Sequence, residues 1–145
     1  MSTLERAIAI AAAAHAGQTD KAGAPYILHP LRMMLTLQTE AERITAVLHD
    51  VIEDTPWTFE QLRAEGFGEE ILAALETVTK REGEDYEAFV QRSAQNPIGR
   101  KVKLADLRDN SDISRISSPT AKDYARLEKY KRAIAVLENE TDQFG

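Results

Sequence analysis

The sequence predicts an all-α protein with a single domain. Apolar residues recur three or four positions apart in most segments, which is the spacing of a buried helix face. Several of these segments begin with a capping threonine, and no segment alternates apolar and polar residues over the length of a strand. The chain has 145 residues, of which 43% are hydrophobic and 29% charged, as expected for one globular unit with one core. We therefore expect residues 1–145 to form one helical domain.

The start and stop signals place the helices in order. Gly17 ends the first expected helix, and Pro30 suits the first turn of the second. Thr39 with Glu42 forms a capping-box pattern before the third, and Thr58 with Gln61 repeats that pattern before a short fourth helix. The expected helices cover about residues 3–16, 30–38, 40–54, 59–65, 69–79, 86–94, 97–113 and 119–139.

The two helical stripes with the clearest periodicity lie in the second half of the chain. Ile71, Leu72, Leu75 and Val78 form the first. Tyr124, Leu127, Tyr130, Ile134 and Leu137 form the second, along one broad face. We favour a core position for this second stripe over a dimer surface, and the chain is expected to be a monomer or a homodimer.

Composition excludes several classes of function. The chain has no cysteine, which excludes disulfides and thiolate metal sites. Its net charge of −6 argues against a general nucleic-acid binder but is compatible with a small anionic substrate if cations gather at one site. No apolar run approaches the roughly 20 residues of a membrane span. Residues 7–14 are short and Ala-rich, and we interpret them as a helix rather than a signal peptide. A cytoplasmic protein is expected.

The candidate chemistry is concentrated in His49, Asp50, Glu53 and Asp54, which interrupt an otherwise apolar helical segment. Desolvating unpaired charge is unfavourable, so a bound cation would explain this cluster. Positions four apart share a helix face, which aligns His49 with Glu53 and Asp50 with Asp54. His49 and Asp50 are roughly 100° apart on a helix and can reach one point, so they would form half of a metal site.

The other half must come from elsewhere in the chain. His29 precedes Pro30, which restricts its backbone to extended geometry, and Asp106 lies in a partly apolar helix with Asn110 four residues later. A set of His29, His49, Asp50 and Asp106 would supply two imidazoles and two carboxylates.

Each piece taken alone also has a purely structural interpretation. His49-Asp50 resembles a satisfied polar pair, and Glu53-Asp54 resembles the solvated end of a helix. Asp106 has Lys103 and Arg108 as candidate ion-pair partners at the surface, and His15 follows an Ala-rich stripe and is interpreted as packed.

Nitrogen and oxygen donors without sulfur suit Mn, Fe, Co, Zn or, less well, Mg. Such an ion lowers the pKa of a bound water and polarises a phosphoryl group. Glu53 or Asp54 would then accept the proton of the water or orient it. Lys21, Lys101 and Lys103 are candidates for offsetting the charge of a phosphorylated substrate.

The four blocks together resemble the HD-domain hydrolases of the RelA/SpoT group, and the small single-domain alarmone hydrolases in particular. The blocks are His15-x-Gly17-Gln18, Pro25-Tyr26-x-x-His29-Pro30, Leu48-His49-Asp50-x-x-Glu53-Asp54-Thr55 and Lys103-Leu104-Ala105-Asp106-x-x-x-Asn110. They occur in order over about residues 3–137.

The resemblance implies an all-helical HD-domain fold, one divalent metal, typically Mn²⁺, and removal of the 3′-pyrophosphate from ppGpp and pppGpp to give GDP or GTP. It implies His29, His49, Asp50 and Asp106 as metal ligands. It implies Glu53 and Asp54 as the residues that activate the water. Lys21, Tyr26 and Asn110 fall where the family contacts its nucleotide.

The chain departs from the family pattern beside these blocks. Asp20 stands where the family has an arginine that packs on the guanine base, Ile113 stands for a threonine, and Leu107 for a basic residue. Two alternatives therefore stay open: an HD-domain phosphohydrolase of another nucleotide or phosphoester such as NADPH, and a non-catalytic nucleotide-binding module. A chain of 145 residues is too short for an additional synthetase domain, so alarmone synthesis is not expected.

Overall fold

The computed structural model describes residues 2–144, with side chains for residues 2–139. The described chain is helical, with one isolated β-bridge between Thr19 and Pro25, and the prediction of an all-α fold is confirmed. The helices are α1 (Leu4–Ala14), α2 (Leu28–Thr36), α3 (Glu40–Leu48), α4 (Val51–Asp54), α5 (Phe59–Ala64), α6 (Glu69–Thr77), α7 (Tyr86–Ala94), α8 (Pro97–Asn110), the 3₁₀ helix η1 (Ile113–Arg115) and α9 (Ala121–Phe144).

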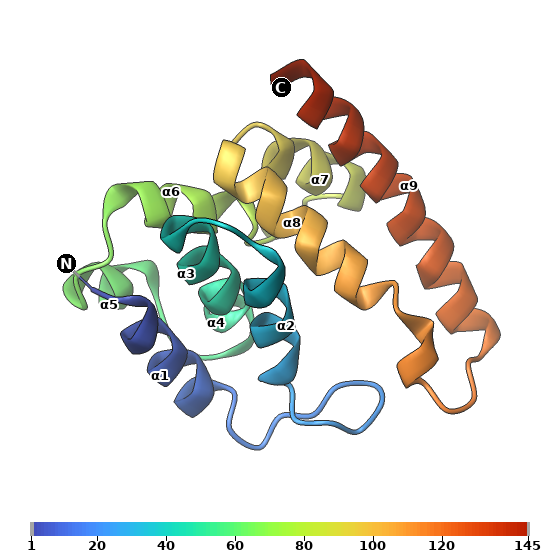
Figure 1. Cartoon of the computed structure of the whole chain (residues 1–145), viewed down its shortest axis with the longest axis horizontal. Coiled ribbons are helices and arrows are strands. Elements are labelled where there is room, and N and C mark those ends of the chain that lie inside the picture. The colour runs from blue at the N-terminus through green and yellow to red at the C-terminus, as the bar shows by residue number, and fades with distance from the viewer. Residues whose placement is uncertain (1, 145) are drawn as a thin grey trace.

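Helix α8 connects the two parts of the core. Helix α3 packs against α1, α2, α6 and α8, and α9 lies along α7 and α8 at the other side of the molecule (Figure 1). One face of α8 places Val102 and Ala105 in the larger apolar cluster with α1, α2, α3 and α6. Its other face places Leu104 and Leu107 in a smaller cluster with α7 and α9. Residues of α8 are therefore held from both sides.

The predicted starts of α1, α3 and α5 are confirmed, whereas α2 begins at Leu28, two residues before the expected start, and His29 lies within the helix rather than in extended backbone. The Thr3 hydroxyl accepts the N–H of Arg6, and both predicted capping boxes are formed. Gly17 adopts a φ of 86° where the chain leaves α1, a conformation that glycine reaches without steric penalty. These local signals give the starts of α1, α3 and α5 to within about two residues.

The predicted single helix over residues 40–54 is wrong, because the chain breaks at His49 and Asp50. Helix α3 ends at Leu48 and α4 begins at Val51. The His49 ring donates from Nδ1 to the Ala46 carbonyl at 2.7 Å, which is the acceptor that a continuous helix would offer to the N–H of Asp50. Asp50 takes φ −103° and ψ 0°, outside helical geometry. The expected alignment of His49 with Glu53 on one face therefore does not hold.

Two further boundaries differ at the C-terminal side. Helix α8 ends at Asn110 rather than 113, because Asp112 caps η1 by accepting from the N–H of Ser114 at 3.2 Å. Helix α9 begins two residues later than expected and extends to Phe144. The apolar stripe of α9 belongs to the core at Leu137, which is fully buried, but not at Tyr124, which is 53% exposed.

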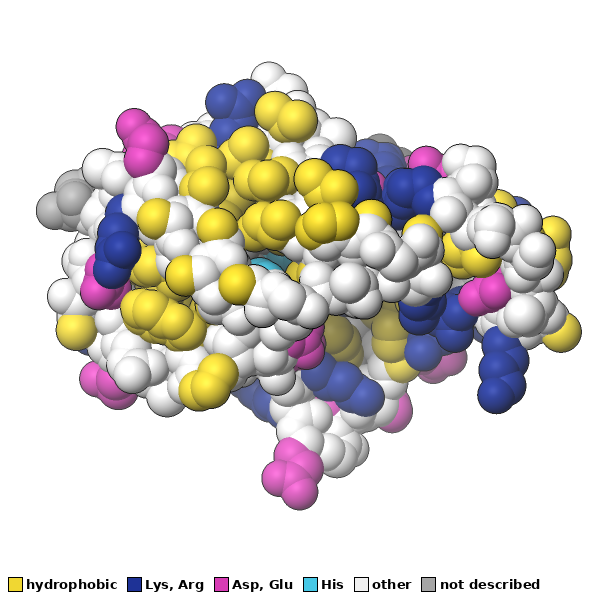
Figure 2. Space-filling model, turned by 90° about the horizontal axis from the view of Figure 1, so that it is seen from below, with side chains coloured by type: hydrophobic (Ala, Val, Ile, Leu, Met, Phe, Trp, Pro, Cys, Tyr) yellow, Lys and Arg dark blue, Asp and Glu magenta, His cyan; other side chains and the backbone are white. Residues whose placement is uncertain are grey.

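The surface shows an uneven distribution of side-chain types. In the view from below, hydrophobic side chains gather over much of one face, and Lys and Arg side chains gather toward the right of it (Figure 2). A histidine is visible only at the bottom of a narrow gap, in accord with the burial of all three histidines (Figure 2). Among the described residues, no helix has the length and apolar character required to cross a membrane.

The core position of Leu75 gives a prediction about stability. Leu75 is fully buried on α6, so Leu75→Ala removes apolar contacts and leaves a cavity, and we expect a loss of about 2–5 kcal/mol in the free energy of unfolding. Leu35→Ala on α2, where the leucine is 75% exposed, is the matched control and should change it by less than about 0.5 kcal/mol. Urea denaturation of both variants measures this, and equal losses would contradict the packing described.

Candidate metal centre

Three side chains from distant parts of the chain meet at one buried point. His29 comes from α2, His49 from the end of α3 and Asp106 from α8, and their candidate donor atoms all lie within 4.8 Å of one another. All three residues are buried. The three elements converge because α2 and α3 both pack against α8. The predicted combination of His29, His49 and Asp106 is thus brought together by the fold.

The hydrogen bonds of His49 leave one ring nitrogen directed at this point. Because Nδ1 donates to a carbonyl, Nε2 is the nitrogen that carries the lone pair when the ring is neutral. Nε2 lies 2.9 Å from Oδ2 of Asp50 and 3.6 Å from Oδ1 of Asp106, yet it is buried with no hydrogen-bond partner. A buried nitrogen lone pair facing carboxylates suits a cation placed between them. The residues present therefore fit a divalent metal.

Asp50 lies at the edge of the same cluster. Its Oδ2 accepts a hydrogen bond from the Tyr26 hydroxyl, which fixes the carboxylate beside His49. Tyr26 was expected near the nucleotide, and in the structure its ring also contacts the rings of His15 and His29. Asp50 is thus placed next to the group of His29, His49 and Asp106.

Asp106 is the most heavily engaged member of the cluster. Its Oδ1 lies 2.9 Å from Nε2 of His29 and accepts from Asn110 Nδ2 at 3.0 Å, while Oδ2 accepts from Lys103 Nζ at 2.9 Å. The sequence left open an exposed ion pair with Lys103. The pair exists, but both residues are buried. Lys103 therefore neutralises the buried Asp106 carboxylate through Oδ2, while Oδ1 faces His29.

The charges of the cluster reinforce one another. Burial raises the pKa of Asp106, but the nearby Lys103 ammonium and the hydrogen bonds with the two histidines lower it more, and the net pKa is well below its usual range. Burial lowers the pKa of His49, but Asp50 and Asp106 raise it more, and the net shift is upward. His29 follows the same balance through Asp106 and Asp109. These surroundings favour positive charge, and a divalent cation would supply it.

Asp109 was not predicted from the sequence as a residue of the site. Its Oδ2 accepts from Nδ1 of His29 at 2.6 Å, and its two oxygens accept from Nε and Nη2 of Arg32 at 2.7 and 2.9 Å. The available signal was its position three residues after Asp106, which places both on one face of a helix. No feature of the sequence indicated that His29 lies beneath that face.

Glu53 and Asp54 lie on α4, beside the cluster. Loss of hydration and the charge of Asp50 raise the pKa of both carboxyls. Glu53 Oε1 also accepts the backbone N–H of Lys80. That N–H belongs to a loop held by Arg92, whose Nη2 donates to the Thr79 carbonyl at 2.7 Å. The loop therefore fixes Glu53.

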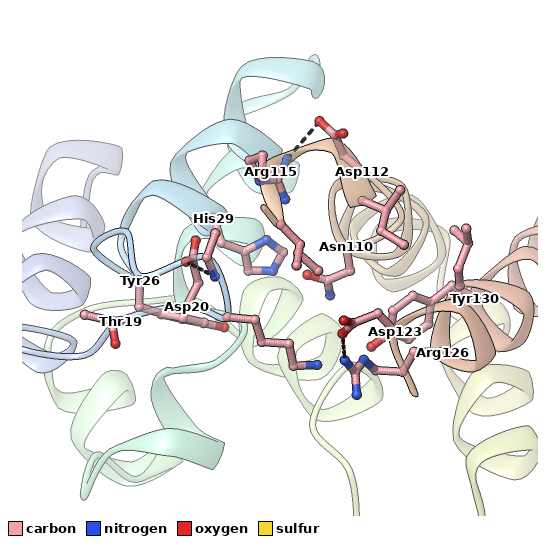
Figure 3. Close-up of a pocket in the computed structure, with 15 residues that line it drawn as sticks. Thr19, Asp20, Tyr26, His29, Asn110, Asp112, Arg115, Asp123, Arg126 and Tyr130 are labelled. Atoms are coloured by element: carbon pink, nitrogen blue, oxygen red, sulfur yellow. Dashed lines mark hydrogen bonds and ion pairs between the residues drawn. The ribbon is translucent and has the colours of Figure 1, made fainter. Parts of the chain in front are cut away.

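A cavity of 420 Å³ opens beside His29. Lys21, Tyr26 and Asn110, three of the predicted substrate residues, line it, and the buried Lys103 does not. His29 and Asn110 lie between the side of Tyr26 and the side of Tyr130 (Figure 3). The cavity also contains two arginines that the sequence did not single out, Arg115 and Arg126, paired with Asp112 and Asp123 respectively.

Asp20 lines the same cavity but is engaged with its own loop. Its Oδ1 accepts the backbone N–H groups of Ala22 and Ala24 at 2.9 and 3.0 Å. The residue at the position of the family arginine therefore stabilises a turn.

Comparison with known proteins identifies the family of the chain. Residues 7–111 match the model of the HD domain, a span that contains all four predicted metal ligands. The chain belongs to the HD-domain family. For an HD domain with this cluster, a divalent metal is implied.

Two curated relatives of this chain are much longer proteins. It is 35% identical over 119 residues, 74% of its length, to a protein of Aquifex aeolicus named guanosine-3′,5′-bis(diphosphate) 3′-pyrophosphohydrolase. It is 34% identical over 132 residues, 82% of its length, to a probable GTP pyrophosphokinase of Mycobacterium leprae. The chain spans only 17% of the length of each of these relatives.

A solved structure shares the fold. It is described as "A metazoan ortholog of SpoT hydrolyzes ppGpp and plays a role in starvation responses". The TM-score is 0.76 at 21% sequence identity, and the match covers 99% of this chain and 93% of that one. The helix α9, beyond the matched HD-domain residues, is therefore part of a fold that the solved structure also has.

The position of Asp50 gives a prediction about metal binding. Asp50→Ala removes a carboxylate 2.9 Å from Nε2 of His49, and we expect divalent metal affinity to fall by more than about 10-fold. Asp54→Asn, on α4 outside the cluster, should retain the metal. Metal analysis of the two proteins after dialysis against Mn²⁺ measures this. Full metal content in Asp50→Ala would remove Asp50 from the ligand set.

The loop that holds Glu53 gives a prediction about pH. Hydrogen bonds from Arg92 lower the pKa of Glu84 from 4.5 to about 2. A lowered folded-state pKa stabilises the protein above the unfolded-state value, so this contribution is lost as pH falls from 4.5 toward 2. We expect Glu84→Gln to flatten the loss of stability over that interval, with the exposed Glu87→Gln as control. Urea midpoints at several pH values measure it, and unchanged slopes would argue against the pair.

Proposed function

We propose that this HD domain is a metal-dependent hydrolase that removes the 3′-pyrophosphate from ppGpp and pppGpp. The products are GDP or GTP and pyrophosphate. The observation that carries the proposal is the cluster of His29, His49 and Asp106 directly beside a cavity that contains three cationic side chains. The name of the Aquifex relative supports the choice of substrate. We further propose that residues 1–145 form a single domain of this type, and that it acts in the cytoplasm.

The proposed ligands of the metal are His29, His49, Asp50 and Asp106, and the proposed metal is Mn²⁺. Two imidazoles and two carboxylates form a mixed nitrogen and oxygen set that suits this ion. When bound, the ion would lower the pKa of a water and offset charge on the phosphoryl oxygens. Asn110 and Lys103 hold the Asp106 carboxylate in place for this role.

Glu53 and Asp54 are proposed to manage the proton of the attacking water. Water adds to the phosphorus that is bonded to the ribose 3′ oxygen, and the bond between that phosphorus and that oxygen breaks. One carboxylate accepts the proton of the water, and the 3′ oxygen leaves as a hydroxyl once it is protonated. The raised pKa of both carboxyls makes each a better proton acceptor than an ordinary surface carboxylate.

Phosphate binding is assigned to the cations of the cavity. Loss of hydration and then the positive charge of Arg126 lower the pKa of Lys21. A polyanion between Lys21 and Arg126 would relieve that repulsion, because it attracts both groups. Arg115, on η1, adds a third positive charge to the wall.

A second candidate substrate class is favoured by Asp20. Because Asp20 accepts two backbone N–H groups of its own loop, it is not arranged to stack on a guanine base as the family arginine does. The same metal centre would then act on another phosphorylated nucleotide such as NADPH. A panel in which this substrate is turned over faster than ppGpp would favour the second candidate.

The proposal is tested by an assay of purified, Mn²⁺-loaded protein with ppGpp. We expect release of pyrophosphate and GDP in equal amounts. Glu53→Gln should lower kcat by about 10²–10⁴-fold, because general-base catalysis contributes that much, while metal content is retained. No turnover of ppGpp by metal-loaded wild type would overturn the proposed activity. Equal turnover by wild type and Glu53→Gln would overturn the role of Glu53 alone.

A further inference from the structure

We propose that Asp109 is a positioning residue, which orients the imidazole of His29 for metal binding, and that Arg32 in turn fixes Asp109. The inference rests on the metal centre of the proposed function and extends it, because it assigns a role to a carboxylate outside the four expected ligands. It concerns metal affinity, so it can be tested whichever phosphorylated compound is the substrate.

The first step is the contact between the two side chains. Oδ2 of Asp109 lies 2.6 Å from Nδ1 of His29, and the two side chains are only 11% and 6% exposed. A carboxylate can only accept, so Nδ1 carries the hydrogen. The opposite nitrogen, Nε2, faces Oδ1 of Asp106 at 2.9 Å, and it can give its lone pair to a cation placed there. Asp109 therefore keeps a hydrogen on Nδ1 and leaves Nε2 as the nitrogen that a cation would engage.

The second step is the anchoring of Asp109 itself. Arg32 donates from Nε to Oδ1 at 2.7 Å and from Nη2 to Oδ2 at 2.9 Å, which is a two-point contact that prevents rotation of the carboxylate. Arg115 donates from Nη2 to the Asp109 backbone carbonyl at 2.8 Å. Both the side chain and the backbone of Asp109 are thus held.

The third step is the relation between this anchor and the cavity. Arg115 belongs to η1 and lines the cavity, whereas His29 lines the cavity and belongs to the metal cluster. Asp109 contacts both, although it does not itself line this cavity. One carboxylate therefore joins the wall of the proposed phosphate pocket to a proposed metal ligand.

The arrangement predicts an effect on metal affinity. A histidine ligand whose other ring nitrogen donates to a carboxylate is fixed in orientation and is a stronger base, and removal of such a partner weakens metal affinity about 10–100-fold. Asparagine cannot replace Asp109, because Oδ2 accepts from both His29 and Arg32 while Oδ1 accepts from Nε of Arg32, and asparagine keeps only one of these two oxygens and no charge. Its amide would direct N–H donors at one of these two donors instead.

The experiment is a calorimetric titration of the full-length, metal-stripped protein with MnCl₂. Asp109→Asn should raise the Kd for Mn²⁺ about 10–100-fold. Glu84→Gln is the matched control, because Glu84 is 12% exposed and paired with an arginine but is not in contact with a histidine. Its Kd should equal that of wild type. An Asp109→Asn protein with the wild-type Kd would overturn the inference.

A second measurement separates positioning from a general loss of structure. ¹⁵N NMR of the histidine rings in the metal-free protein should show a hydrogen-bonded Nδ1–H on His29 in wild type and in Glu84→Gln, and a loss of that signal in Asp109→Asn. An unchanged Nδ1–H signal of His29 in Asp109→Asn would count against the role proposed for Asp109.

A third variant covers the case in which Asp109→Asn does not fold. Arg32→Met removes the two-point anchor, at a side chain that is 32% exposed, and keeps the contact between Asp109 and His29. We expect a weaker Kd for Mn²⁺ than in wild type but a smaller loss than in Asp109→Asn, and a wild-type Kd would overturn the anchoring role. Failure of wild type to hydrolyse ppGpp would leave these metal affinities unaffected, so the two proposals fail separately.

Discussion

The buried carboxylate of Asp106 is the constraint on which the site depends. A carboxylate at this depth is unfavourable unless its charge is met by donors, and here an ammonium, an amide and an imidazole surround it. Lys103 and Asn110 lie three residues before and four residues after Asp106, so one helix supplies two of these partners in the correct direction. His29 must come from another helix, and α2 therefore has to pack where it does. The polar cluster thus fixes the position of α2 on α8 as well as providing chemistry.

The break between α3 and α4 follows from the same cluster. A continuous helix through residues 40–54 would direct the N–H of Asp50 at the Ala46 carbonyl, whereas here that carbonyl accepts the N–H of His49 at 3.3 Å together with the His49 ring. In the structure the ring takes the carbonyl, and Nε2 is directed at Asp106. The lost backbone bond is offset by the burial of Val51, which returns to the apolar core immediately after the break. The regular helix α3 therefore ends where the His49 ring is oriented toward the cluster.

Local rules predicted most of the fold but less of the site. Capping by Thr39 and Thr58 and the stripe of α6 depend on residues within a few positions of one another, so the sequence displays them. The resemblance of the sequence blocks to the HD family already grouped His29, His49 and Asp106 as metal ligands. The spacing of these residues alone would not have grouped them. Asp109 and Arg115 were missed because their roles arise from contacts across the fold, with His29 80 residues away in the first case. A surface-like Asp in a charged stretch carries no local sign of such a partner.

The distribution of charge adds a final argument about what the cavity can accept. The whole chain is acidic, with a net charge of −6, so its outer field repels long polyanions. Inside the cavity, Lys21, Arg115 and Arg126 place three positive charges within a 420 Å³ space whose wall also carries Asp20, Asp112 and Asp123. A nucleic-acid backbone needs an extended basic face, whereas a compact phosphorylated nucleotide needs only a small cationic pocket. Because Asp123 and Asp112 already pair with Arg126 and Arg115, an incoming phosphate must compete with carboxylates for these arginines. That competition favours ligands with several negative charges close together over those with one, which agrees with the diphosphate group of the proposed substrate.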